Sequence, residues 1–331
     1  MERTLLSGRI NKGSWPKEIG NYLKRRKSSF LLLFFLSFNL GVFSAFNLAA
    51  SPKIRVVTTI FPLKEFAQAV CQDKAQVELL LPPGAEVHTW RPRPTDIVRL
   101  TKADLLIYIG ADLEPWIHDL LKGIKNPKLK ILEASSALSL REGKQISHPP
   151  GEEHHRLDPH IWLDFQMDQV IIEKIALSLS DIDPENSLFY HKNSNLYKAR
   201  LQKLDQKFRD TLKDCAQRTF ILGGHSAFGY LARRYNLKQI ALYGLSPDSK
   251  PSPRQLVEIV ELAKKHKIKI IYFEKYISHE LARVIAQEVG AKTLVLNPAA
   301  NLSRKELESG VTFFDIMERN LKNLKNGLLC Q

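Results

Sequence analysis

The sequence predicts an α/β protein of two Rossmann-like lobes, each with a mainly parallel sheet, joined by one long rigid helix. Strand-like and helix-like segments alternate in both halves of the chain, which is the pattern of βαβ units. Between these halves, residues 184–216 read as helix and contain no glycine and no internal proline. The length of 331 residues is that of about two domains.

The first lobe is expected over residues 53–183. Runs rich in β-branched and other apolar residues mark its strands, at 53–60, 76–84, 104–110 and 128–135. Segments with helical periodicity separate or follow these strands, at 61–73, 93–103, 113–124 and 165–182. Thr95 or Asp96 gives the second of these helices a capping signal.

The bridging helix is expected over residues 184–216. Pro184 suits the first turn of a helix, and Asp183 before it suits the capping position. A helix of about 30 residues at 1.5 Å per residue would be about 45 Å long, which is enough to run along two domains.

The second lobe is expected over residues 217–331. Its strands are predicted at 218–224, 238–245, 268–274 and 291–297. The helices between and after them are predicted at 226–236, 252–267, 278–290 and 310–328. Ser252 is a capping residue for the second of these helices, and Gly290 ends the third.

Residues 1–50 are predicted to be a signal peptide or a membrane anchor. A basic segment ending in "LKRRKSS" precedes an apolar run over 30–50 that ends in small residues at Ala49 and Ala50. The apolar run approaches the length of a membrane span, so an uncleaved anchor is the alternative. No cysteine directly follows this run, so no lipid-anchored N-terminus is predicted. We therefore expect export to the periplasm.

The composition limits the classes of function. The net charge is +14, of which residues 1–50 contribute +6 and the remainder +8, with basic residues interleaved among apolar ones. No helix-turn-helix, RNP or zinc-finger spacing occurs, so we expect no nucleic-acid binding. Cys71, Cys215 and Cys330 form no C-x-x-C motif, so a cysteine metal site is not expected. One pair could form a disulfide in an oxidising compartment, but the sequence does not identify the pair.

Potential metal ligands follow several predicted strands. In open parallel sheets, ligands bind beyond the carboxyl ends of the strands. The residues at such positions are His88, His160, His225, Glu274 and Asn297. Three neutral imidazoles suit Zn(II), and the affinity order of divalent metals would also favour Cu(II) or Ni(II). Taken singly, each histidine is more often structural than a ligand.

Several long segments, in order, resemble the solute-binding proteins of zinc and manganese ABC importers, the ZnuA/TroA-like group. The likeness covers nearly all of residues 53–325. It is carried by "LLPPGAEVHTWRPRPTDIVRLTKADLLIYIGADLEPW", "DPHIWLD", "GGHSAFGYLARRYNL" and "GLSPDSKPSPRQLVEIVELAKKHKIKIIYFE".

The resemblance implies a metal held between the two lobes by His88, His160 and His225. Members that resemble manganese binders carry Glu at the third position, whereas zinc binders carry His, as this sequence does at His225. The family often has Asp where this sequence has Asn297. The fourth ligand is therefore water, Asn297 or Glu274.

The implied function is capture of Zn(II) outside the cytoplasmic membrane and delivery to an ABC permease by a monomeric protein that is not an enzyme. An importer of Mn(II) or another divalent metal is the alternative, and a zinc hydrolase with Glu274 as base or an adhesin are the remaining ones. No H-E-x-x-H or G-x-S-x-G motif supports a hydrolase. The histidine-rich segment "HPPGEEHHRL", with His148, His154 and His155, either collects metal or is an exposed polar loop.

Overall fold

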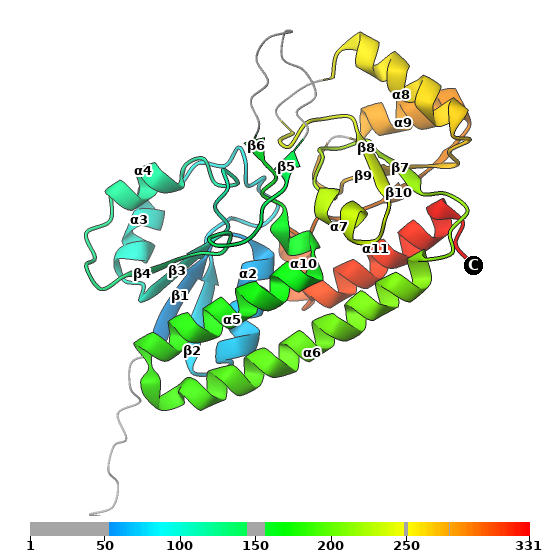
Figure 1. Cartoon of the computed structure of the whole chain (residues 1–331). Coiled ribbons are helices and arrows are strands. Elements are labelled where there is room, and N and C mark those ends of the chain that lie inside the picture. The colour runs from blue at the N-terminus through cyan, green and yellow to red at the C-terminus, as the bar shows by residue number, and fades with distance from the viewer. Residues whose placement is uncertain (1–52, 144–155, 248–250, 278) are drawn as a thin grey trace, which may run out of the picture. The chain divides into compact units, whose positions relative to one another are not determined.

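Two four-stranded parallel sheets form the framework of the protein, as Figure 1 shows, and they confirm the predicted fold class. The computed structural model describes residues 53–143, 156–247, 251–277 and 279–331. The first sheet has the order β2-β1-β3-β4 and the second the order β10-β9-β7-β8. The strands of the first sheet are β1 (Ile54–Thr58), β2 (Ala75–Leu79), β3 (Leu105–Tyr108) and β4 (Lys130–Glu133). Those of the second are β7 (Thr219–Leu222), β8 (Lys238–Ala241), β9 (Ile270–Phe273) and β10 (Lys292–Val295).

Both faces of each sheet are covered, which explains the nearly continuous apolar character of the strands. Neighbouring residues of a strand point to opposite faces. Accordingly, Val56 packs beside the helix α2 (Phe61–Cys71), while Val57 packs with Leu100 and Leu120 on the other side. In the second sheet, Ile221 likewise faces the cluster beneath α8 (Pro253–Lys265) and α9 (Glu280–Val289).

The helices mostly occur where the periodicity predicts them. In the first lobe they are α2 (Phe61–Cys71), α3 (Pro94–Thr101), α4 (Ile117–Lys122) and α5 (Phe165–Ile182). In the second lobe they are α7 (Gly229–Arg234), α8 (Pro253–Lys265), α9 (Glu280–Val289), α10 (Arg304–Glu308) and α11 (Phe313–Leu328). Ser252 caps α8 and Gly290 follows α9 in the left-handed conformation, as predicted.

The predicted cap of α3 is wrong. Arg93 occupies the N-cap position and Pro94 is the first helical residue. Asp96 lies in the first turn instead, where its Oδ2 accepts a hydrogen bond from the Arg93 backbone N–H at 2.8 Å. Proline fits the first helical position because the amide hydrogen there has no partner within the helix.

The long helix α6 (Ser187–Leu212) connects the two lobes. A 3₁₀ turn, η3 (Pro184–Asn186), precedes it, so the helix begins three residues later than Pro184. It packs along α5 and also contacts α2 in the first lobe and α11 in the second (Figure 1). The lobe boundaries given above remain predictions, but the bridging role of this helix is confirmed.

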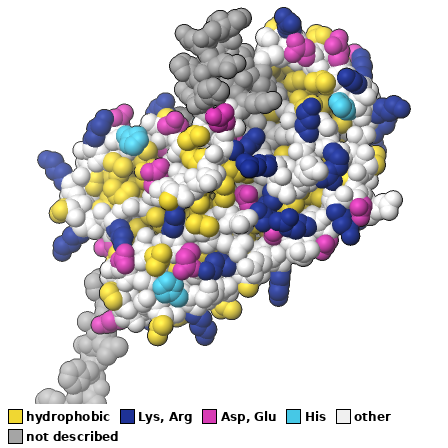
Figure 2. All heavy atoms as spheres, in the orientation of Figure 1, with side chains coloured by type: hydrophobic (Ala, Val, Ile, Leu, Met, Phe, Trp, Pro, Cys, Tyr) yellow, Lys and Arg dark blue, Asp and Glu magenta, His cyan; other side chains and the backbone are white. Residues whose placement is uncertain are grey.

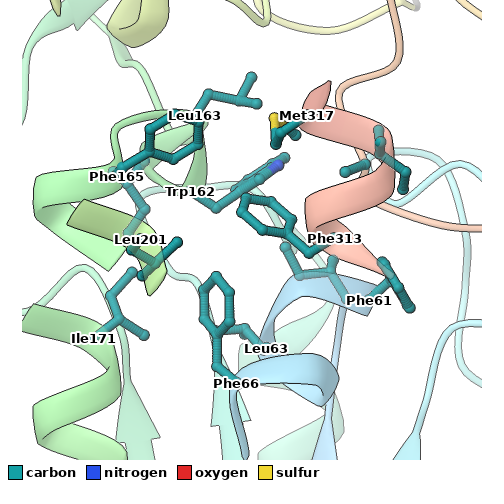
Figure 3. Packing of buried hydrophobic residues seen from close by; sticks show 14 of the residues in the cluster. Phe61, Leu63, Phe66, Trp162, Leu163, Phe165, Ile171, Leu201, Phe313 and Met317 are labelled. Atoms are coloured by element: carbon teal, nitrogen blue, oxygen red, sulfur yellow. The ribbon is translucent and has the colours of Figure 1, made fainter. Parts of the chain in front are cut away.

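The largest hydrophobic cluster extends through both lobes. Figure 3 shows its centre, where Phe66 of α2, Phe165 of α5 and Phe313 of α11 meet. Phe313 packs edge-on against both of the other rings, with centroids 5.4 Å and 6.3 Å away. The buried Trp162 donates its Nε1 hydrogen to the carbonyl oxygen of Pro298, at 2.6 Å. Apolar packing therefore continues across the interface between the lobes.

Cys215 and Cys330 form a disulfide, and Cys71 is buried as a free thiol. The disulfide joins the chain after α6 to the chain after α11, which resolves the pairing that the sequence left open. Within the described residues, no helix has both the length and the apolarity to cross a membrane. The predicted signal or anchor at 1–50 lies outside the described residues. On the face drawn in Figure 2, Lys and Arg are dispersed among acidic, apolar and uncharged side chains.

Candidate metal centre

The order of the second sheet places two polar residues at one point. After β7 the chain forms β8 on one side of that strand and then crosses over to form β9 on its other side. The topological switch therefore lies between β7 and β9. His225 follows β7 and Glu274 follows β9. The carboxyl ends of the strands on either side of a switch form a crevice, which is where α/β proteins bind ligands.

Glu274 holds His225 at this switch point. Its Oε1 accepts hydrogen bonds from the His225 backbone N–H at 2.7 Å and pairs with His225 Nδ1 at 2.9 Å. The close approach explains Gly224, because a Cβ there would lie 1.9 Å from Glu274 Oε1. With Nδ1 paired to the carboxylate, Nε2 of His225 is left to face the interior of the site.

Asp158 holds His160 in the same way. Its Oδ1 accepts from the His160 backbone N–H at 3.0 Å and pairs with Nδ1 at 2.8 Å, while its Oδ2 accepts from the Arg141 guanidinium at 2.7 Å. These residues flank a short antiparallel pair, β5 (Glu142–Gly143) and β6 (Arg156–Leu157). His160 then opens the 3₁₀ turn η2 (Ile161–Leu163).

His88 lies on the loop that leaves β2. Asn301 of the second lobe fixes this loop, since its Nδ2 donates to the carbonyl oxygens of Pro82 and Ala85 at 2.7 and 2.9 Å. The Trp116 indole donates to the carbonyl oxygen of Val87 at 3.2 Å. Among the described residues, His88 Nε2 is buried and has no hydrogen-bond partner. An unpartnered buried acceptor or donor is costly, so this atom calls for a ligand.

The three histidines converge although they are far apart in the sequence. Each offers one ring nitrogen within 4.8 Å of those of the other two, and His160 Nε2 lies 3.0 Å from His225 Nε2. All three side chains are buried. Each imidazole comes from a different loop, so the arrangement depends on the tertiary fold.

The electrostatic surroundings of the three rings differ. Burial, followed by the charges of the neighbouring rings, holds the pKa of His88 well below its usual value. Burial also lowers the pKa of His160 and outweighs Asp158. For His225 burial is the largest single effect and lowers the pKa, but Glu274 and more distant carboxylates together raise it above the usual value. At neutral pH, His88 and His160 are therefore neutral and able to bind a metal.

The two other predicted ligands have different partners. The side-chain oxygen of Asn297 accepts from the Ala299 backbone N–H at 2.8 Å. Glu274 Oε1 is occupied by His225, as described above. Both residues line one hollow, together with Ala85 of the loop that carries His88. Their assignment as ligands remains a prediction.

Sequence reasoning missed Asp158 and Arg141. Asp158 stands two residues before His160, and a carboxylate so close to a candidate histidine ligand was a usable signal. Arg141 carried none, because its contact depends on the pairing of β5 with β6. His148, His154 and His155 of the histidine-rich segment lie outside the described residues.

Comparisons with known proteins agree with this geometry. A family model described as "ZnuA: Zinc-uptake complex component A periplasmic" matches residues 56–327. The high-affinity zinc uptake system protein ZnuA of Bacillus subtilis (strain 168) is 40% identical over 282 residues, which cover 84% of this chain and 88% of that protein.

Two further similarities concern a streptococcal protein. The zinc-binding lipoprotein AdcA of Streptococcus pneumoniae (strain ATCC BAA-255 / R6) is 38% identical over 281 residues, 83% of this chain. The chain spans 56% of the length of that relative. The solved Zn(II)-bound ZnuA-like domain of Streptococcus pneumoniae AdcA matches with a TM-score of 0.71 and 37% identity, over 84% of this chain and 99% of that one.

Proposed function

The chain belongs to the family of the periplasmic component A of zinc-uptake complexes, and from this premise we propose that it captures Zn(II) outside the cytoplasmic membrane and delivers it to an ABC permease. The observation that carries the proposal is the convergence of three buried imidazoles, one of them with an unpartnered Nε2. Zinc is the substrate of this protein and not a resident cofactor, and no enzymatic step is proposed.

The donor set and its spacing favour zinc. Zn–N bonds of about 2.0 Å in a tetrahedron separate two nitrogens by about 3.3 Å. The Nε2 atoms of His160 and His225 are 3.0 Å apart, so these two rings need to move little to bind a common ion. Mn(II) prefers oxygen ligands, which the three imidazoles do not supply.

We assign the three histidines as direct ligands and leave the fourth position to water. Asp158 and Glu274 then act through His160 and His225, because each pairs with the Nδ1 atom of its histidine. Carboxylate partners of this kind fix the orientation of metal-binding imidazoles and increase their basicity. The side-chain oxygen of Asn297 accepts a hydrogen bond from the Ala299 backbone N–H. We therefore do not assign Asn297 as a ligand.

Isothermal titration of the protein with Zn(II) tests the proposal. We expect sub-micromolar binding of one ion and its loss in His225→Ala. The matched control is His118→Ala, since His118 is exposed on α4 and should bind no metal at this site. Absence of zinc binding in the wild type, or binding unchanged in His225→Ala, would contradict the proposal.

The zinc-hydrolase alternative gains no support from the geometry. A hydrolase needs a free general base beside the open metal position. Glu274 is the candidate base that the sequence offers, but its Oε1 already accepts both hydrogen bonds from His225. The arrangement suits binding and release better than turnover.

A further inference from the structure

Tyr230 joins the two loops that carry His160 and His225. It is the second residue of α7, and its ring is buried. Its hydroxyl oxygen accepts a hydrogen bond from the Arg141 backbone N–H at 3.1 Å. The same hydroxyl donates to the carbonyl oxygen of Asp158 at 2.9 Å. A single side chain of the second lobe thus binds the backbone on both sides of the β5–β6 pair in the first lobe.

The residues bound by Tyr230 also hold His160. Asp158 is fully buried, and its carboxylate bridges the imidazole of His160 and the guanidinium of Arg141. The guanidinium lies over the Tyr230 ring, 5.6 Å from its centroid. Gly229 makes room for it, because a Cβ there would lie 1.5 Å from Arg141 Nη1. We call Arg141, Asp158 and Tyr230 the latch.

The latch connects directly to the other ligand loop. Tyr230 stands five residues after His225, and the turn between them is closed by the hydrogen bond from Ala227 N–H to the His225 carbonyl oxygen at 2.8 Å. His225 and Tyr230 therefore lie on one short segment, in which this turn leads directly into α7. His160 stands two residues after Asp158, so the Tyr230 hydroxyl sets the position of one imidazole relative to the other.

Other contacts between the lobes do not involve the Tyr230 hydroxyl. The Trp162 indole bonds to Pro298, and the Phe61 N–H donates to the Ala300 carbonyl oxygen at 3.0 Å. These contacts would keep the lobes together if the latch were opened. Loss of the Tyr230 hydroxyl should accordingly disturb the metal centre and leave the fold in place.

We propose that Tyr230 is a positioning residue of the metal centre, whose hydroxyl fixes the spacing of His160 and His225 and thereby limits the rate at which the metal leaves. The inference rests on the proposed zinc-binding function. It assigns a kinetic role to a residue that touches no metal.

Release of Zn(II) to a chromogenic chelator, followed by stopped flow, tests the proposal. Changing the partners behind a metal-binding imidazole typically alters metal affinity by about 10- to 100-fold. We expect Tyr230→Phe to release zinc at least about tenfold faster than the wild type. Its matched control is Tyr190→Phe, which also removes one hydroxyl from a buried tyrosine, here one that donates to Asp183 at 2.6 Å at the far end of α5.

A second readout separates positioning from general destabilisation. The Co(II) form of Tyr230→Phe should show shifted d–d absorption bands, because the imidazoles change their arrangement around the ion, while Tyr190→Phe keeps the wild-type spectrum. Gly229→Ala should disrupt the latch by a second route, because the added methyl group displaces the Arg141 guanidinium. This variant should also release zinc faster than the wild type. It decides the question in the same way if Tyr230→Phe does not fold.

The outcomes distinguish this proposal from the one on which it rests. If the wild type binds no zinc, the proposed function fails. If the wild type binds zinc and Tyr230→Phe releases it at the wild-type rate with an unchanged Co(II) spectrum, the latch proposal alone is overturned. Equal acceleration in Tyr190→Phe would overturn it as well.

Discussion

The two histidines held by carboxylates are not equivalent. Asp158 pairs with both His160 and Arg141. Among the basic side chains of the described residues, Glu274 forms an ion pair with His225 alone. The pKa of His160 is lowered and that of His225 is raised. As the pH falls, His225 should therefore be the first of the three ligands to gain a proton.

This difference predicts the pH dependence of zinc binding. A proton and a metal compete for the same imidazole, so affinity is full above the pKa of His225 and falls as the pH drops through it. Because Glu274 raises that pKa, Glu274→Gln should move the fall in affinity to lower pH. Titration calorimetry with Zn(II) between about pH 5 and 8 measures both curves, and superimposable curves would refute the role given to Glu274.

Asn297 provides a second test at the scale of a single residue. Its side-chain oxygen accepts from the Ala299 N–H, so Asn297→Ala should cost about 1 kcal/mol of stability through the lost hydrogen bond. Zinc affinity should change by less than about threefold, because the side chain is not assigned as a metal ligand. For scale, a loss of 1 kcal/mol in binding free energy would lower the affinity about fivefold. A loss of tenfold or more would show that Asn297 is a direct ligand. Urea unfolding and zinc titration of the same preparation provide the two values.

The sequence predicted the three histidines that converge, but it did not predict the residues that hold them in place. His88, His160 and His225 were recognisable because each follows a strand-like segment and because the surrounding motifs resemble one family. Tyr230 carried no such signal. Its role depends on how α7 meets the β5–β6 pair, and neither periodicity nor local spacing encodes the placement of one lobe against the other.

At the scale of the elements, regular segments were predictable and short ones were not. All eight strands of the two sheets occur at the predicted positions, since buried parallel strands leave long apolar runs. The pair β5–β6 has only two residues in each strand, and α10 has five, so neither shows a period. The early start assigned to the bridging helix failed because Pro184 initiates a 3₁₀ turn before α6.

The disulfide links the ends of two helices, and its removal should lower the free energy of unfolding. It closes a loop with a sequence separation of 115 residues between the ends of α6 and α11. Cross-links of this kind typically stabilise by about 2–4 kcal/mol, chiefly by restricting the unfolded chain. The double variant Cys215→Ser/Cys330→Ser should lose about that amount in urea unfolding, and Cys71→Ser serves as the control for loss of a thiol that forms no disulfide.

Zinc binding should survive that double variant. Glu274 and the latch hold His225 and His160, and Asn301 fixes the loop of His88. The hydrogen bonds by which they do so are made to residues other than the two disulfide cysteines. Zinc titration under the conditions of the unfolding experiment checks this. A large loss of affinity in the folded double variant would mean that the disulfide also shapes the metal centre.

At the scale of the whole molecule, the two described lobes share the largest hydrophobic cluster. The sequence predicted separate lobes correctly, because each has its own alternation of strands and helices. It did not predict the apolar cluster common to both, which brings together Phe66, Phe165 and Phe313 from three distant segments (Figure 3). Which apolar faces meet across a lobe boundary depends on the final packing and not on the pattern of any one segment.

The shared cluster also limits how such a protein can evolve. Two lobes with independent cores could be exchanged between relatives as modules. Here a chimera that took its second lobe from another family member would bring a foreign partner to Phe66 and Phe165 in place of Phe313. Mismatched volumes in a close-packed interior are costly. Inheritance of the two halves should therefore be linked, with a substitution in one lobe compensated by a later one in the other.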